Sequence, residues 1–411
     1  MRLKILTILI FIVALGAAGF FVYQHFFHSN LPEGKEGAGG ISSEGTQEEG
    51  WRPTEAECRN PELQQKCDEY CSQHPDACPG WISPDKRGAF SGAQPLALPS
   101  KEEKASLMRN YPSTIKAINE GPAIYGTGPG TGGSITNENL EKIKDTGFNT
   151  VQLFIMPAQE DGKFYIDPYN ESVLFNDIIK VKKSNLAAWV AFTYASGPAP
   201  EQKIGSYNKF KPAFLEFVKK ISKELEEYKV EYITVHTEPD LIFQKQEWGG
   251  TEVKNNLIDF FPSGNIAARE NFSGKIINKV TDLNYLSRNG EVLDAALEDV
   301  DIVAIDVGPP PNQMNLEIYR KEFDSYQKFA SLTAEKNVPW MVGEYWMTDF
   351  FQAPSSYVKK NQVQLARASF DAYLKTLPKG AGYTWNDFST FSLEPNGEAT
   401  RLAIKDFFSK M

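Results

Sequence analysis

Two glutamates that end apolar, strand-like runs are the residues of this sequence best suited to chemistry. Glu238 ends the run at 230–238, and Glu344 ends the run at 339–344. A run that stops on a carboxylate directs the acid beyond the edge of a sheet. If both strands belong to one parallel barrel, the two carboxylates share its mouth, because functional groups of such barrels sit at the carboxyl ends of the strands. A facing pair of carboxylates is the equipment for cleaving a glycosidic bond.

Further polar and aromatic side chains lie near the ends of the predicted strands. Aromatic rings stack on sugar rings, and polar groups hydrogen-bond sugar hydroxyls, so this mixture is typical of a carbohydrate site. The candidate substrate-binding residues are Tyr194, His236, Thr237, Asp306, Trp346, Trp385 and Asn386. For His236 and Trp346, a packing role is the open alternative.

The elements that must position these residues alternate between strand-like and helix-like patterns from about position 117. The candidate strands are at 123–128, 149–156, 187–194, 231–238, 275–280, 302–307, 340–345 and 381–385. Amphipathic stretches such as 210–228 and 399–410 separate or follow them. Eight strands with crossover helices predict an α/β fold, a closed (β/α)8 TIM barrel.

An open, doubly wound sheet is the competing architecture. It would require a phosphate-binding loop after the first strand, and the glycine-rich segment 126–133 superficially suggests one. Its spacing does not match the dinucleotide-binding fingerprint, and Pro129 lacks a backbone donor that such a loop would use. We therefore expect a loop at the barrel rim rather than a phosphate site.

Composition supports a folded protein of barrel size. The chain has 411 residues, of which 41% are apolar and 12% aromatic, enough for one large domain with additional segments. The formal net charge of -10 provides no basic field for phosphate backbones, so no nucleic acid partner is expected. The oligomeric state is not readable from the sequence.

The first 28 residues predict a membrane anchor. The apolar run 5–23 would form a helix of about 28 Å, long enough to span a bilayer. Arg2 and Lys4 precede it, which predicts a cytoplasmic amino end with the catalytic domain outside the cytoplasm. A cleaved signal peptide, which would leave a secreted protein, is the alternative. Residues 29–50, rich in Gly, Glu and Ser, predict a flexible linker.

Residues 51–100 form a cysteine-rich, helix-compatible segment and its connection. All four cysteines of the chain lie in it, at Cys58, Cys67, Cys71 and Cys78. An even cluster in an exported chain predicts two disulfides, whose pairing the sequence leaves open. A zinc site involving His74 is the sharper alternative, but the spacing fits no usual zinc pattern. Residues 101–411 then form the catalytic barrel.

The region from about 117 to 411 resembles the retaining (β/α)8-barrel glycoside hydrolases of the clan A type. In that clan the acid/base glutamate ends strand four, and the nucleophile ends strand seven. The matching segments are 236–239, which contains Glu238, and 342–346, which contains Glu344. The resemblance implies that Trp385, after strand eight, forms the aromatic floor of the sugar subsite. It identifies no particular family within the clan.

The resemblance also implies a double-displacement mechanism on a β-linked oligo- or polysaccharide. Ionised Glu344 would attack the anomeric carbon while Glu238 protonates the leaving oxygen, with the carboxyl groups about 5 to 5.5 Å apart. No metal or other cofactor is expected, because His236 is the one histidine of the barrel region.

Two departures from the clan's pattern motivate a second hypothesis. Thr237 stands where the clan usually has asparagine before the acid/base residue, and strand six ends on Asp306 without the usual tyrosine. The alternative is therefore a carbohydrate-binding or cell-surface scaffold protein on a barrel that has lost catalysis.

Overall fold

The computed structural model describes residues 95–125, 135–160, 162–193, 205–246, 248–307, 316–345, 356–386 and 396–411, together with four helical residues, Lys66, Glu69, Tyr70 and Gln73. Backbone contacts divide the chain into two units, Met1–Cys78 and Pro79–Met411. The predicted anchor at 1–28, the linker at 29–50 and the four cysteines lie outside the described residues. No helix in the described part of the chain combines the length and apolar character needed to cross a bilayer.

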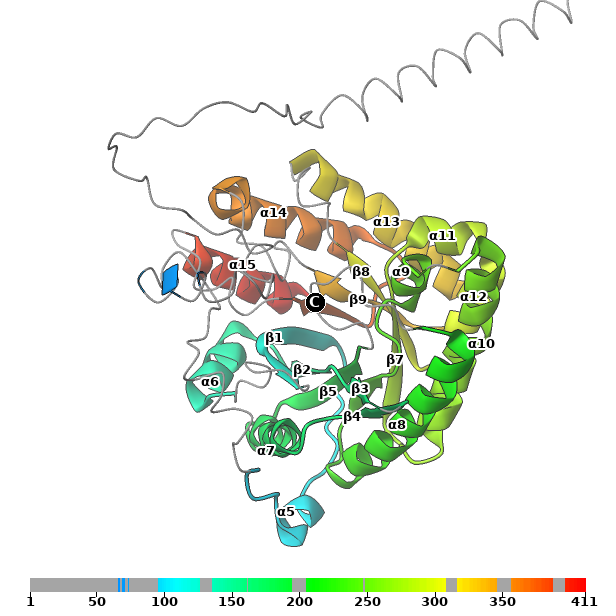
Figure 1. The fold of residues 1–411 in the computed structure, drawn as a ribbon. Helices are drawn as coiled ribbons and strands as arrows, with labels where there is room; N and C mark the ends of the chain where they lie inside the picture. Colours follow the sequence, from blue (N-terminus) through cyan, green and yellow to red (C-terminus); the bar gives the residue numbers. More distant parts are fainter. Residues whose placement is uncertain are drawn as a thin grey trace, which may run out of the picture. The chain divides into compact units, whose positions relative to one another are not determined.

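The second unit contains a closed parallel barrel of eight strands (Figure 1). Around the barrel the order is β1, β10, β9, β8, β7, β6, β5, β2, which is the sequential order of a (β/α)8 fold. The strands are β1 (Ile115–Tyr125), β2 (Thr150–Ile155), β5 (Ala187–Phe192), β6 (Tyr232–Thr234), β7 (Lys275–Val280), β8 (Ile302–Val307), β9 (Trp340–Tyr345) and β10 (Gly382–Trp385). The predicted α/β barrel is confirmed, and closure excludes the open sheet.

Helices follow the strands and surround the barrel (Figure 1). They are α6 (Asn137–Thr146), α7 (Pro168–Lys183), α8 (Tyr207–Glu227), α9 (Pro239–Gln244), α10 (Gly250–Arg269), α11 (Leu283–Arg288), α12 (Gly290–Ala296), α13 (Leu316–Ala334), α14 (Ser356–Lys375) and α15 (Gly397–Lys410), with α5 (Lys101–Ala105) before the barrel. Their ends carry the expected local chemistry. The Thr136 side chain caps α6 by accepting from the Asn139 N–H, and Gly147 ends that helix in a left-handed conformation.

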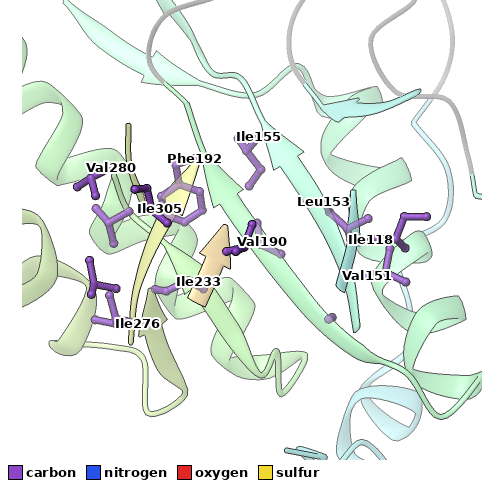
Figure 2. Packing of buried hydrophobic residues seen from close by; sticks show 14 of the residues in the cluster. Ile118, Val151, Leu153, Ile155, Val190, Phe192, Ile233, Ile276, Val280 and Ile305 are labelled. Carbon is purple, nitrogen blue, oxygen red and sulfur yellow. The ribbon is translucent and has the colours of Figure 1, made fainter. Parts of the chain in front are cut away.

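Alternation along the strands divides the core into two layers. Inward-facing side chains such as Trp189, Ile277 and Met341 form a cluster inside the barrel. Outward-facing side chains form a much larger cluster with the helices. Figure 2 shows part of this outer layer, with Val151 and Leu153 of β2 and Val190 of β5 among the labelled residues. The period of two fixes which residues of each strand can reach the barrel interior.

The predicted strands agree with the structure except near the first one and at the end of the fourth. Strand β1 begins at Ile115, eight residues before the predicted start at 123, and its pairing with β2 shifts register between Asn119 and Ile124. The structure also contains an antiparallel hairpin that was not predicted, β3 (Ala158–Glu160) with β4 (Lys163–Tyr165). Strand β6 ends at Thr234, four residues before Glu238.

Candidate active site

Glu238 lies at the turn between β6 and α9. Its backbone adopts φ 52° and ψ 42°, a left-handed conformation that is uncommon for a residue with a side chain, and Pro239 follows directly. The turn is held from β7, because the Glu238 N–H donates to the Lys279 carbonyl at 3.1 Å. The Thr281 hydroxyl donates to Glu238 Oε1 at 2.5 Å. Backbone strain maintained by the surrounding structure is a common feature of functional sites.

Glu344 faces the barrel interior because β9 contains a bulge. The register with β8 shifts after the Ile305–Val342 pair, so that Asp306 pairs with Glu344 and the extra residue is Gly343. A Cβ atom at Gly343 would lie 2.4 Å from Asp306 Oδ1 and 2.7 Å from Ala304 Cβ. The bulge therefore requires glycine at this position, and it turns the next side chain inward.

A buried lysine joins the acids of β8 and β9. Lys279 of β7 forms ion pairs with Glu344 Oε1 and, at 3.1 Å, with Asp306 Oδ2. The Lys279 and Asp306 side chains are fully buried, and the Glu344 side chain is 10% exposed. The Lys279 ammonium also lies 5.2 Å from the centre of the Phe154 ring, an arrangement that favours the charged form.

The charges in this cluster shift one another's pKa values. Burial alone would lower the pKa of Lys279, but the carboxylates of Asp306 and Glu344 offset it and raise that pKa above its usual range. Burial raises the pKa of Asp306 well above its usual range, with Lys279 opposing the shift. Burial also raises the pKa of Glu344; Lys279 lowers it and Glu238 raises it. One ammonium thus faces two carboxyl groups that compete for its charge.

Asp306 is the more weakly stabilised carboxylate of this pair. Among the described residues, no donor forms a hydrogen bond of good geometry with either carboxyl oxygen, although Oδ2 lies near Lys279. Glu344, in contrast, accepts a hydrogen bond from the same ammonium. Since an ionised carboxylate in an apolar environment depends on donors, Glu344 is the better-stabilised anion.

The buried carboxyl group of Asp240 holds the segment beside Glu238. Asp240 accepts from the N–H groups of Thr281 at 3.0 Å and Asp282 at 2.6 Å. Burial raises the pKa of Asp240 to about 7, opposed by these backbone hydrogen bonds. Asp240 thereby fixes the segment whose Thr281 hydroxyl contacts Glu238.

Two further predicted residues, Thr237 and Asn386, lie beside the acids. Thr237 pairs with Lys279 in an isolated parallel bridge and is 6% exposed. Asn386 follows β10, and its Oδ1 accepts from Asn119 Nδ2 of β1 at 2.5 Å. The structure thus brings Glu238, Glu344 and these two residues to the carboxyl ends of the strands, with Asp306 in the buried lysine cluster.

Two of the predicted substrate-binding residues face away from the mouth. The ring of His236 contacts Phe260 and Phe261 of α10, its Nε2 donates to the Phe261 carbonyl at 3.0 Å, and burial lowers its pKa to about 3. Trp385 is 1% exposed and packs against Phe370 of α14. In the structure both side chains pack between the barrel and its helices, and their contact with a sugar stays a prediction. Tyr194 and Trp346 lie outside the described residues.

Two polar residues of the site, Lys279 and Asn119, were absent from the predicted site residues. Lys279 lies two positions after Ile277, which faces the barrel interior, so alternation places it inward as well. Asn119 was missed because its strand was placed too late along the chain. No group of three or more metal-ligating side chains occurs among the described residues.

The barrel fold is similar to the folds of several solved glycoside hydrolases. No protein-family model matches the chain, and no curated protein is similar to it in sequence. A solved β-1,4-mannanase of glycoside hydrolase family 113 superposes with a TM-score of 0.52 at 12% identity, covering 73% of this chain and 100% of the mannanase. A family 5 enzyme from Prevotella bryantii B14 gives a TM-score of 0.54 at 14% identity, with 77% and 100% covered.

A broad-specificity endoglucanase from Clostridium longisporum gives a TM-score of 0.54 at 15% identity, covering 76% of this chain and 99% of the endoglucanase. The predicted resemblance to clan A hydrolases is confirmed at the level of the fold.

Proposed function

We propose that this protein is a retaining glycoside hydrolase that cleaves a β-linked oligo- or polysaccharide, with Glu344 as nucleophile and Glu238 as acid/base. The observation that carries the proposal is the arrangement of the two glutamates. They follow or end barrel strands four and seven, and Glu238 is near enough to Glu344 for its charge to raise the pKa of Glu344. The structurally similar β-1,4-mannanase favours a β-linked substrate.

The surroundings of each glutamate suit its role. Glu344 is held against the Lys279 ammonium, which favours the ionised nucleophile. The Thr281 hydroxyl donates a hydrogen bond to Oε1 of Glu238, so Oε2 is the oxygen that carries the proton toward the substrate. Glu238 is half-buried, so that it remains accessible to a sugar.

In the first step, a Glu344 carboxylate oxygen forms a bond to the anomeric carbon. The glycosidic C–O bond breaks, and its electrons take the proton from Glu238, so that the leaving sugar departs as an alcohol. In the second step, Glu238 removes a proton from water as the water oxygen attacks the same carbon. The bond to Glu344 then breaks, and both glutamates return to their starting forms.

The test compares wild type, Glu238→Gln and Glu344→Gln on mannan, carboxymethylcellulose and β-galactan by measuring new reducing ends. We expect turnover by wild type on at least one polymer and its loss in both variants, by roughly 10²- to 10⁴-fold for the acid/base residue. Glu335→Gln, at an exposed residue directly after α13, is the matched control and should keep wild-type activity. Wild-type levels of turnover in either active-site variant would contradict the assignment.

One observation favours the scaffold hypothesis as the second candidate. Thr237 occupies the position before Glu238 and its Oγ1 has no hydrogen-bond partner among the described residues, whereas an asparagine there would offer an amide. The same assay separates the two functions. Binding to a polymer without turnover by wild type or either variant would support a carbohydrate-binding scaffold.

We also propose that the barrel is tethered outside the cytoplasm by residues 1–28. The support is the apolar run 5–23 behind Arg2 and Lys4. The full chain and a variant lacking residues 1–28 should be compared by membrane fractionation with an alkaline wash. Retention of the full chain alone supports the tether, whereas release of both would contradict it.

A further inference from the structure

Lys279 is a fully buried charged residue inside the barrel. Its side chain is fully buried, and its ammonium is shared between Asp306 on β8 and Glu344 on β9. Burying a charge costs free energy unless the charge is paired, so the ammonium of Lys279 depends on these two carboxyl groups. Two inward-facing neighbours are apolar: Ile277 on the same strand and Ala304 on β8.

Lys279 contacts three residues of the site, Glu238, Glu344 and Thr237. Its carbonyl accepts from the Glu238 N–H, its ammonium pairs with Glu344, and its backbone bridges Thr237. One residue of β7 therefore contacts the segments that carry both proposed catalytic glutamates. A change at Lys279 is transmitted to Glu344 through charge and orientation.

We propose that Lys279 is a positioning residue that keeps the Glu344 carboxylate ionised and oriented for attack, while Asp306 anchors the ammonium. This inference rests on the proposed function. The charged groups that face Glu344 among the described residues are Lys279 from β7, Asp306 from β8 and Glu238 after β6. Lys279 is the one cation among these three, so its removal leaves Glu344 beside two acids.

The test uses Lys279→Met, which keeps an unbranched side chain one atom shorter and removes the charge. Lys279→Gln, which keeps a hydrogen-bond donor, is the second variant if the first does not fold. Lys182→Met is the matched control. Lys182 also has a buried side chain, and it pairs with buried Glu231 at 2.5 Å. Glu231 directly precedes the amino end of β6, whereas Glu344 lies near the carboxyl end of β9.

The first readout needs no substrate. The carboxyl of Glu344 is titrated by ¹³C NMR in protein labelled at the glutamate side-chain carboxyl, with Glu344 identified by its absence in Glu344→Gln. Loss of a neighbouring opposite charge should raise the titration midpoint by roughly 1 to 3 pH units in the Lys279 variants. The midpoint should stay at its wild-type value in Lys182→Met.

The second readout is the pH profile of kcat/KM on 2,4-dinitrophenyl β-cellobioside and 2,4-dinitrophenyl β-mannoside, whose leaving group needs no proton. Because the nucleophile must be ionised, the acid limb should move to higher pH with the NMR midpoint. At a pH about one unit below the shifted limb, kcat/KM should fall roughly 10-fold or more. A purely structural role would not move the limb.

A midpoint and acid limb that both rise in the Lys279 variants alone support the inference. An unchanged Glu344 midpoint overturns it, even if Glu344→Gln abolishes wild-type turnover and so upholds the proposed function. A raised midpoint with an unmoved acid limb also overturns it, because Lys279 would then act on a group that does not limit the reaction.

Discussion

Replacing Gly343 with alanine should disturb the active site through a single added methyl group. Ordinary contact begins near 3.4 Å, but the new Cβ would meet Asp306 Oδ1 at 2.4 Å, about 1 Å too close. Ala304 Cβ at 2.7 Å blocks the alternative direction, and Lys279 Cε follows at 3.3 Å. Gly343 is not in the left-handed region, so the cost arises from crowding and not from backbone strain.

Overpacking of this kind costs about 1 to 3 kcal/mol of unfolding free energy. The side chains that must yield are the ones that hold Glu344, and a misplacement of about 1 Å can reduce catalysis by roughly 100-fold. We therefore expect Gly343→Ala to lower both stability and kcat/KM. Urea denaturation measures the first, and hydrolysis of the polymer that wild type cleaves measures the second.

Gly290→Ala is the matched control, because a Cβ there meets nothing within 4 Å. It should leave activity unchanged and alter stability by no more than about 1 kcal/mol, in the favourable direction for a helical position. If Gly343→Ala kept both wild-type stability and wild-type kcat/KM, the bulge would have room for a side chain. The argument that glycine is needed to direct Glu344 would then be refuted.

Three further substitutions test other parts of the structure. Glu322 of α13 is buried, and its carboxyl accepts a hydrogen bond from the Tyr326 hydroxyl. Burial raises the pKa of Glu322 from 4.5 to about 8, so the folded state binds the proton more tightly than the unfolded state does. The free energy of unfolding therefore falls as the pH rises from 4.5 to about 8. Between about pH 4.5 and 8.5, wild type should therefore lose on the order of 4 kcal/mol relative to Glu322→Gln in urea titrations, with Glu335→Gln as control; parallel pH curves would contradict this. Thr281→Val removes the hydrogen bond to Glu238 and should lower kcat/KM about 10-fold on a polymer but far less on a dinitrophenyl glycoside, so equal losses on both would count against a role in proton donation. His236→Ala should cost about 2 to 4 kcal/mol by leaving a cavity and removing the hydrogen bond to the Phe261 carbonyl, yet change KM by less than about threefold. A large rise in KM at unchanged stability would indicate substrate contact.

The barrel could be predicted because most of its strands are short apolar runs with clear ends. The predicted strands at 275–280, 302–307 and 340–345 coincide with β7, β8 and β9. Strand β1 was misplaced because Lys116 and Asn119 interrupt its apolar pattern, while the later segment at 123–125 is more apolar. Burial of a polar inward-facing residue is a property of the closed barrel, which local pattern does not reveal.

The direction of individual side chains was harder to predict than the strands. Strict alternation from Tyr232 and Thr234 would turn His236 inward, but the chain leaves β6 after Thr234 and the ring packs against α10. The opposite occurs in β9, where the bulge at Gly343 breaks the alternation and turns Glu344 inward. Both departures depend on contacts with neighbouring elements, which the spacing of residues along one strand cannot express.

The central claim is that Glu344 forms a covalent bond to the sugar, and trapping that intermediate tests it most directly. Wild type is incubated with 2,4-dinitrophenyl 2-deoxy-2-fluoro-β-cellobioside and with the corresponding β-mannoside, and the intact protein and its peptides are analysed by mass spectrometry. We expect a mass increase of one fluorosugar unit on the peptide that contains Glu344, and none in Glu344→Gln. A label on another residue, or hydrolysis of the parent glycoside by wild type without any trapped intermediate, would contradict the mechanism.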